Sequence, residues 1–325
     1  MSKALGLLSG GLDSTLAAMT LMRQGIAVTG IAFVTPFFGA GKARAAAKTI
    51  GFPLIVREIG SLHLEMVKNP KYGYGRNMNP CIDCHAMMFR LAGEIMEQEG
   101  FDFLFSGEVL GQRPMSQNAN ALKSVANYSG YPERVLRPLS AKLLPVTPME
   151  EAGIVDRERL LDIQGRSRRR QQALAIDWGF PDFPSSGGGC LLTEVGFSNR
   201  LRDLLRHSPG ASVNDAELLK VGRQFRISAT TKLILGRNQE DNDRLEKLAE
   251  PCQLKLRCAD FNGPLGLVCG QAEERELESA AAILASYGKG KDEKQVKVLI
   301  INQDKEIELS VAPMAREVSR GMILA

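Results

Sequence analysis

Hydrophobic positions in the first half of the chain alternate between short continuous runs and helical repeats. Short apolar runs are typical of buried strands, and we expect them at Ala4–Leu8, Ala27–Val34, Pro53–Ile59, Phe101–Phe105 and Val135–Leu139. Apolar residues that recur every three or four positions indicate helices, and we expect these at Ser14–Arg23, Gly41–Ile50, Cys84–Gln98 and Ala152–Ile176. Strands that alternate with helices predict an α/β fold with a parallel, Rossmann-like sheet.

The pattern changes after a segment rich in Pro, Ser and Gly. Such composition is typical of a boundary, so we expect a first domain over residues 1–182, a Gly-rich linker over 183–196 and a second domain over 197–325. The second domain has more strands than helices and short connections. We therefore expect a smaller α+β domain there, including a hairpin formed by Val296–Ile301 and Glu306–Val311.

Length and composition agree with this division. A chain of 325 residues suggests about two domains, and 44% hydrophobic content is that of a globular protein. We find no apolar stretch long enough to cross a membrane and no export signal, so we expect a cytoplasmic protein. In that compartment the six cysteines are metal-binding, catalytic or buried rather than paired in disulfides. The net charge of +4 permits an anionic partner.

One short segment carries the clearest chemistry, namely Ser9-Gly10-Gly11-Leu12-Asp13-Ser14 between the first strand and the first helix. Glycines let backbone N–H groups approach an anion closely, and the helix start adds unpaired N–H groups and a positive dipole end. Ser9 and Ser14 supply hydroxyls, and Asp13 orients the loop or holds Mg²⁺. The segment is neither a Walker loop nor a GxGxxG turn.

This hexapeptide resembles the SGGxDS loop of the PP-loop ATP pyrophosphatases. The resemblance implies that Ser9, Gly10, Gly11, Asp13 and Ser14 bind ATP, and that pyrophosphate is released. The superfamily includes enzymes with quite different substrates. The loop therefore predicts how ATP is split without identifying what is activated.

Three cysteines form a second candidate site. Cys81 and Cys84 are three residues apart at a helix start, where thiolate pKa values are lowered. We expect Cys190, in its glycine-rich loop, to fold back over the ligand-binding edge of the sheet. Four interpretations stay open: a zinc site with His85 as fourth ligand, a redox or persulfide pair of Cys84 and Cys190, an iron–sulfur cluster with one open iron, and plain burial.

Several segments around these cysteines resemble the tRNA thiolation enzymes. Asn79–Cys84 is similar to their NPCxxC segment, Ser106–Gln112 resembles the TGExxGQ segment of the tRNA 4-thiouridine synthetases, and Leu136–Leu139 resembles a motif downstream. The resemblance covers roughly residues 3–195. It implies that Ser106 and Gly107 also contact ATP. The N-terminal RNA-binding domain and the rhodanese domain known in some of these enzymes have no counterpart in this sequence.

In the cluster-dependent members of that group, a CxxC pair and one remote cysteine hold a [4Fe-4S] cluster whose open iron carries sulfide. The resemblance implies the same role for Cys81, Cys84 and Cys190. It also assigns these three cysteines and Asp13 to catalysis.

Basic residues suggest an RNA partner. Phosphate contacts are what arginines supply to RNA binding, and four arginines stand close together, namely Arg166, Arg168, Arg169 and Arg170. In the second domain, Gly236–Asn242 resembles the GRNxxEN segment of the RNA-binding domain of NFACT proteins, which implies that Arg237 contacts RNA.

These observations together predict an ATP-dependent tRNA thiouridine synthase. Its cofactors would be ATP, Mg²⁺ and a [4Fe-4S] cluster, and its partners would be tRNA and sulfide or another sulfur donor. Two alternatives stay open: sulfur transfer or amidation of a small molecule, and a non-catalytic RNA-binding protein. The sequence gives no indication of the oligomeric state or of the uracil carbon that is modified.

Overall fold

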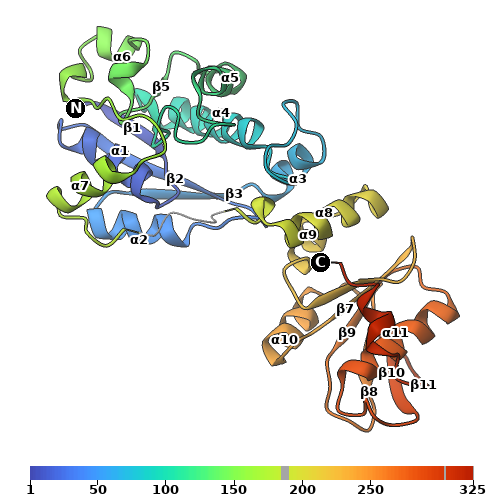
Figure 1. Ribbon diagram of the computed structural model, residues 1–325. Helices are drawn as coiled ribbons and strands as arrows, with labels where there is room; N and C mark the ends of the chain where they lie inside the picture. Colours follow the sequence, from blue (N-terminus) through green and yellow to red (C-terminus); the bar gives the residue numbers. More distant parts are fainter. Residues whose placement is uncertain (184–189, 304, 325) are drawn as a thin grey trace. The chain divides into compact units, whose positions relative to one another are not determined.

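The computed structural model describes residues 1–183, 190–303 and 305–324. The chain divides into two compact units, Met1–Leu191 and Leu192–Ala325 (Figure 1). This division lies inside the segment 183–196, whose role as a linker stays a prediction because Gly187–Gly189 are outside the described residues. In the part of the chain that the structure describes, no helix is both long and apolar enough to cross a membrane.

A five-stranded parallel sheet forms the centre of the first unit, with the order β3-β2-β1-β4-β5. Its strands are β1 (Lys3–Leu7), β2 (Ala27–Val34), β3 (Leu54–Glu58), β4 (Phe103–Ser106) and β5 (Val135–Leu136). The predicted α/β class with a parallel sheet is confirmed. All five strands lie at the predicted places, although β5 is shorter than the apolar run that contains it.

Helices cover both faces of this sheet (Figure 1). One face packs on α1 (Leu12–Met22), α2 (Gly41–Ile50) and α7 (Arg169–Asp177), and the other on α4 (Cys81–Glu99) and α5 (Ala119–Ser129). Side chains alternate along each strand, so Phe103 and Phe105 face the first group and Leu104 faces the second. After β1 the chain enters α1 on one face, whereas after β4 it enters α5 on the opposite face.

The prediction of one long helix over Ala152–Ile176 is wrong. The structure has a short helix α6 (Pro148–Glu151), a 3-10 turn η2 (Arg157–Arg159) and then α7. Gly153 and Gly165 adopt positive φ angles of 68° and 83°, which end helical geometry. Two further helices of this unit, α3 (Gly60–Lys68) and α5, were not predicted.

The second unit contains a six-stranded antiparallel sheet with the order β11-β10-β8-β9-β7-β6. Its strands are β6 (Arg223–Arg226), β7 (Thr231–Leu235), β8 (Leu254–Cys258), β9 (Gly266–Gly270), β10 (Val296–Asn302) and β11 (Lys305–Val311). Its helices are α8 (Val195–His207), α9 (Val213–Leu218), α10 (Gln239–Leu248), α11 (Glu274–Tyr287) and α12 (Arg316–Arg320).

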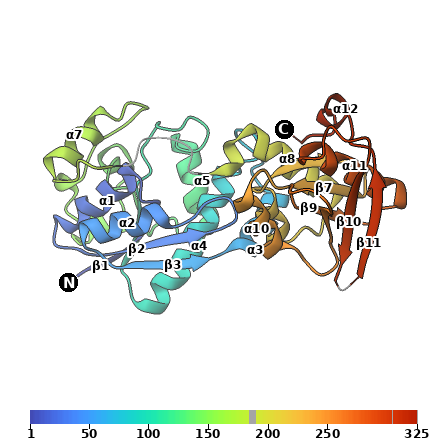
Figure 2. The same ribbon diagram turned by 90° about the horizontal axis from the view of Figure 1, so that it is seen from below.

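Two cores lie on the faces of this second sheet. Helix α11 packs on one face through Ala280, Ile283 and Leu284 (Figure 2). Leu218 of α9 and Leu245 of α10 pack on the other face. The mixture of helices and antiparallel strands is the α+β arrangement predicted for this half of the chain.

Candidate active site

The glycine-rich loop joins β1 to α1 at the carboxyl edge of the parallel sheet. Gly10 adopts a positive φ of 71°, and a Cβ atom there would lie 2.1 Å from the backbone carbon of Lys42. Only glycine fits such a position. Gly11 is the N-cap of α1 and offers no side-chain cap, which leaves the first amides of the helix able to bind an anion.

The two serines of this loop face each other. The hydroxyl oxygens of Ser9 and Ser14 are 3.2 Å apart, and the Ser14 hydroxyl donates to the carbonyl oxygen of Gly11 at 3.0 Å. The loop therefore presents glycine amides and two hydroxyl groups from one short stretch of backbone. This arrangement is suited to binding phosphate oxygens.

The segment after β4 packs directly against this loop. A Cβ atom on Gly107 would lie 2.4 Å from the amide nitrogen of Ser14, so the two backbones touch where glycine permits it. Ser106 is buried, and its hydroxyl donates to Glu108 Oε2 at 3.1 Å. Two segments that are far apart in the sequence thus form one edge of the site.

Asp13 is the most constrained side chain of the loop. Its Oδ2 atom accepts from Arg168 Nη2 at 2.8 Å and from Gln112 Nε2 at 2.7 Å. Its Oδ1 atom is buried and has no hydrogen-bond partner within residues 1–183, 190–303 and 305–324. A buried carboxylate oxygen normally has a partner, and oxygen is the ligand that Mg²⁺ prefers. Asp13 therefore fits the predicted metal-binding role through Oδ1.

The sequence predicts that Arg168 binds RNA. In the structure its guanidinium forms an ion pair with Asp13 of the phosphate loop. Arg170 forms an ion pair of 2.6 Å with Asp162. Arg166 and Arg169 are exposed. The four arginines of this cluster thus have different surroundings, and Arg166 and Arg169 are the two best placed for a phosphate partner.

Cys81 and Cys84 occupy the first turn of α4, directly after Pro80 at the N-cap. The Cys81 thiol donates to Asn79 Oδ1 at 3.1 Å. Burial raises the pKa of Cys81, and the guanidinium of Arg113 partly offsets this effect. Cys190 belongs to the same unit, where the neighbouring Leu191 amide donates to the carbonyl oxygen of Phe37 at 3.1 Å.

Cys81 and Cys190 both lie within electrostatic reach of Cys84, and among the described residues the three cysteines form no disulfide. Burial raises the pKa of Cys84 well above its ordinary value, and the charges of Cys190 and Cys81 raise it further. Among the described residues, no group of three or more Cys, His, Asp or Glu side chains is arranged to hold a metal ion. The thiols therefore belong to a side-chain type that binds metals, but they are not arranged around a common metal position.

One ring nitrogen of His85, the possible fourth zinc ligand, contacts a buried carboxylate. Its Nδ1 atom lies 2.8 Å from Oε1 of the buried Glu108. Oε2 of Glu108 accepts from Arg137 Nε at 2.9 Å. Burial alone would raise the pKa of Glu108, but the charge of Arg137 and the hydrogen bond from His85 outweigh burial and lower this pKa to about 2.

His63 is a site residue that sequence reasoning missed. It lies on α3, it is fully buried, and its Nε2 atom is 3.2 Å from Cys84 Sγ. Burial lowers the pKa of His63 to about 4, so the imidazole is neutral near pH 7. No sequence motif surrounds His63, and only the packing of α3 against α4 brings it to the cysteines.

In the second unit, side chains of the segment Gly236–Asn242 form local contacts at the start of α10. Asn238 is the N-cap of α10 and accepts from the Asp241 amide at 2.9 Å. Arg237 forms an ion pair of 2.6 Å with Asp241, although its side chain remains 51% exposed. Arg237 therefore retains an accessible guanidinium, as a phosphate contact requires.

Two other cations of this unit are more buried than their charge predicts. Lys232 of β7 is 5% exposed, and burial lowers its pKa to about 8. Arg200 of α8 has a buried Nε atom without a hydrogen-bond partner. Buried cations are normally paired, so these two add to the candidate anion-binding groups.

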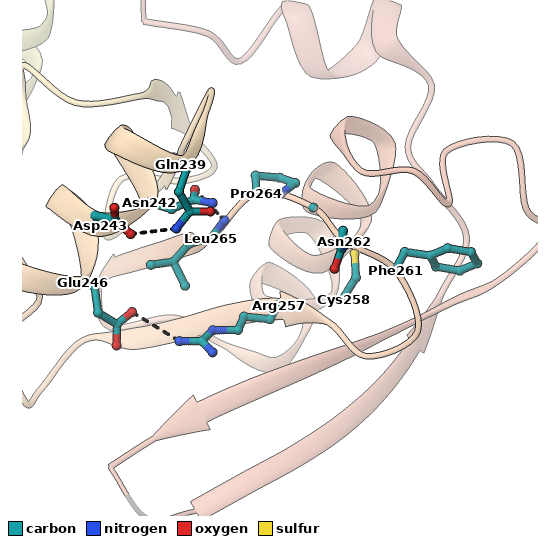
Figure 3. Close-up of a pocket in the computed structure, with 11 residues that line it drawn as sticks. Gln239, Asn242, Asp243, Glu246, Arg257, Cys258, Phe261, Asn262, Pro264 and Leu265 are labelled. Carbon is teal, nitrogen blue, oxygen red and sulfur yellow. Dashed lines mark hydrogen bonds and ion pairs between the residues drawn. The ribbon is translucent and has the colours of Figure 1, made fainter.

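A cavity of about 440 Å³ lies in the second unit between α10, β8 and the loop 261–265 (Figure 3). Several of its polar groups are already paired. Gln239 Nε2 donates to Asp243 at 2.7 Å, and Asn242 Oδ1 accepts from the Leu265 amide at 3.0 Å. This cavity contains none of the predicted site residues.

Two family models match the chain. Residues 1–142 match the family described as thiamine biosynthesis protein (ThiI), and residues 222–320 match the NFACT protein RNA binding domain. The first unit resembles ThiI. The second unit contains the NFACT-like segment, and both resemblances predicted from the sequence are confirmed.

Curated relatives of the ThiI-like unit include the probable tRNA sulfurtransferases of Staphylococcus aureus strains MRSA252 and Newman. Each is 32% identical over 145 residues, which cover 42% of this chain and 34% of the relative. This chain thus spans about a third of the length of the curated relatives that it matches.

Two solved structures are also similar. A 4-thiouridine synthetase–RNA complex with bound ATP is 22% identical, with a TM-score of 0.40, over 55% of this chain and 41% of that one. The C-terminal part of the fibronectin/fibrinogen-binding protein of Streptococcus suis is 14% identical, with a TM-score of 0.29, over 49% of this chain and 79% of that one. TM-scores this low carry no functional inference.

Proposed function

We propose that this protein uses ATP to thiolate a uracil base of tRNA. The observation that carries the proposal is the position of the three cysteines in the same unit as the phosphate loop. Glu108 connects the phosphate loop with the cysteines. It follows Gly107, which packs against the phosphate loop, and its charge acts on Cys81. The match of this unit to ThiI and the tRNA sulfurtransferase relatives support the same reaction.

The first step would take place at the phosphate loop. The glycine amides and the start of α1 would hold the phosphates of ATP, and Asp13 would hold a Mg²⁺ ion, which when bound would supply charge neutralisation. The uracil carbonyl oxygen attacks the α-phosphorus, a new O–P bond forms, and the bond to pyrophosphate breaks. Pyrophosphate leaves, and the carbonyl oxygen becomes part of a good leaving group.

The second step exchanges this oxygen for sulfur. A sulfur nucleophile adds to the activated ring carbon, and AMP departs with the former carbonyl oxygen. Cys81, Cys84 and Cys190 supply thiol donors of the type that holds a [4Fe-4S] cluster, three where a fully cysteinyl cluster uses four, and both Cys81 and Cys190 lie within electrostatic reach of Cys84. When bound, such a cluster would supply one iron without a protein ligand, where sulfide can be held. Cys84 is buried, so bulk water has little access to its thiol.

The RNA would be held by phosphate contacts from both units. Arg166 and Arg169 are exposed beside α7, and Arg237 is half exposed in the NFACT-like segment. In the same second unit, Arg200 Nε has no hydrogen-bond partner in the described part of the chain, and Lys232 is a buried cation. The target uracil has to be unstacked to reach the loop, so it would lie in a bend or loop of the tRNA.

Replacement of Asp13 by Asn tests the ATP step. The variant should release pyrophosphate at least about a hundredfold more slowly in the presence of tRNA, because the loop loses its anionic metal ligand. Pyrophosphate release is measured directly, and tRNA nucleosides are analysed by mass spectrometry for thiolated bases. Asp162→Asn, which removes the exposed partner of Arg170, is the matched control and should keep wild-type rates. Equal turnover of both variants would refute a role for Asp13.

Replacement of Gly107 by Ala tests the contact between β4 and the loop. The added Cβ atom would overlap the Ser14 backbone and displace the loop, so ATP should bind about tenfold or more weakly. Calorimetric titration with ATP gives the affinity. Gly39→Ala is the control, because a Cβ atom there meets nothing within 4 Å. Unchanged affinity for Gly107→Ala would mean that ATP binds elsewhere.

A small-molecule substrate is the second candidate, and the description of the matched family as a thiamine biosynthesis protein favours it. Pyrophosphate release that a small carboxylic acid stimulates and tRNA does not would support this alternative. Binding of tRNA without any pyrophosphate release would instead indicate a non-catalytic RNA-binding protein.

A further inference from the structure

His63 is held rigidly in an apolar part of the first unit. The imidazole is 0% exposed, and its ring lies between Phe37 and Phe38 at centroid distances of 5.4 and 5.3 Å. The Phe38 ring meets it edge-on, with an interplanar angle of 88°. Packing of this kind leaves the ring little freedom to rotate.

The two ring nitrogens of His63 have different surroundings. Nε2 lies 3.2 Å from Cys84 Sγ, whereas Nδ1 is buried and has no hydrogen-bond partner among the residues that the structure describes. A neutral imidazole has one N–H donor and one nitrogen acceptor. Buried N–H groups without a partner are rarer than unsatisfied acceptors. The proton is therefore better placed on Nε2, where it points at the sulfur, than on Nδ1.

Cys84 needs such a donor if it is to act as a sulfur ligand. A metal ligand is a thiolate, and the Cys84 side chain is only 8% exposed, so water has little access to it. A hydrogen bond from a neutral donor favours the negative sulfur without adding another charge.

We propose that His63 is a positioning residue that donates its Nε2–H group to the Cys84 sulfur and stabilises this sulfur as a ligand of the cluster. The inference rests on the proposed function for the cluster itself. The hydrogen bond, in contrast, is a property of the chain alone and can be tested without any metal.

The first experiment determines the tautomer of His63 in the reduced, metal-free full-length protein. The chain has only three histidines, so nitrogen-15 NMR of the labelled imidazoles is readily assigned with a His63→Gln variant. We expect the Nε2–H tautomer. The Nδ1–H tautomer would overturn the proposal, because Nε2 would then accept a proton from the thiol.

The second experiment measures the midpoint potential of the anaerobically reconstituted cluster by a spectroscopic redox titration. Hydrogen bonds to cluster sulfurs raise the potential, so His63→Leu should shift it to more negative values by the equivalent of roughly a tenfold change in the redox equilibrium. His63→Gln retains an amide donor and should restore part of the shift. Equal potentials for wild type and His63→Leu would overturn the proposal.

Pulsed EPR of the reduced cluster separates hydrogen bonding from ligation. A strong coupling to a histidine nitrogen that His63→Gln removes would show that His63 binds iron, and this result would also overturn the proposal. A wild-type protein that takes up no iron would refute the cluster in the proposed function. In that case the NMR result alone decides whether His63 donates to Cys84.

Discussion

Replacement of Cys81, Cys84 or Cys190 by serine, one at a time, is expected to reduce tRNA thiolation by at least about a hundredfold, while tRNA-stimulated pyrophosphate release continues. Serine keeps the size of the side chain but is a poor ligand and a poor sulfur carrier. The phosphate loop does not use these thiols, so the ATP step should survive. Mass spectrometry of tRNA nucleosides and a pyrophosphate assay on the same samples measure both steps.

Cys252→Ser is the matched control, because Cys252 is exposed and lies in the second unit. It should keep wild-type thiolation. Iron analysis distinguishes the open interpretations of the three cysteines: a cluster predicts about four irons per chain in wild type and loss of iron in each variant. A colourless protein that contains zinc and is fully active would contradict the cluster. Full thiolation by any of the three variants would contradict the site itself.

Replacement of Glu108 by Gln is expected to lower the free energy of unfolding of the first unit by about 3 kcal/mol at pH 7. The native pKa of Glu108 is about 2, against an ordinary value of 4.5, and each unit of pKa difference is worth about 1.4 kcal/mol. Removal of one partner from a buried ion pair typically costs a similar amount, because Arg137 loses its counter-charge.

This contribution depends on pH in a defined direction. Because the native pKa is lowered, the stabilisation is fully present above the unfolded value near 4.5 and is lost as the pH falls toward 2. The difference in stability between wild type and Glu108→Gln should therefore shrink across this range. Trp178, the only tryptophan of the chain, packs against the core of the first unit and reports its unfolding by fluorescence in urea.

Glu65→Gln is the control for this measurement. Glu65 pairs with Lys68 on the surface and its side chain is 69% exposed, so its loss should cost less than about 1 kcal/mol. A Glu108→Gln variant that is as stable as this control, or whose difference from wild type does not change with pH, would show that the buried network contributes little.

Much of the first unit was predictable because its signals are local. Buried strands of a parallel sheet are nearly continuous apolar runs, so Ala27–Val34 was predicted with the bounds that β2 has. The wrong helix over Ala152–Ile176 had a different cause. This segment contains turns held by side chains, as where the Glu158 amide donates to Asp156 Oδ1, and periodicity does not report such bonds.

The candidate site was predictable only where a contiguous motif carries it. The loop Ser9–Ser14 and the Cys81–Cys84 pair are such motifs. The contact of His63 with Cys84 joins two helices, and the sequence around neither residue contains a pattern that predicts this contact. The contact of Arg168 with Asp13 also joins distant segments, and charge alone does not predict it, while the RNA contact of Arg168 stays a prediction.

The opposite directions in which the chain leaves β1 and β4 have a consequence for mutation and design. Neighbouring parallel strands whose connections depart to opposite faces leave a crevice at their carboxyl ends, and open α/β sheets bind ligands at this switch point. In this sheet β1 and β4 are such neighbours, and the segments that follow them meet at Gly107 and Ser14. The order of the strands thus predicts the place of the proposed nucleotide site. Substitutions at Ser9 or Ser14 would change the affinity for the nucleotide, whereas only a different order of the strands would change the position of the proposed site.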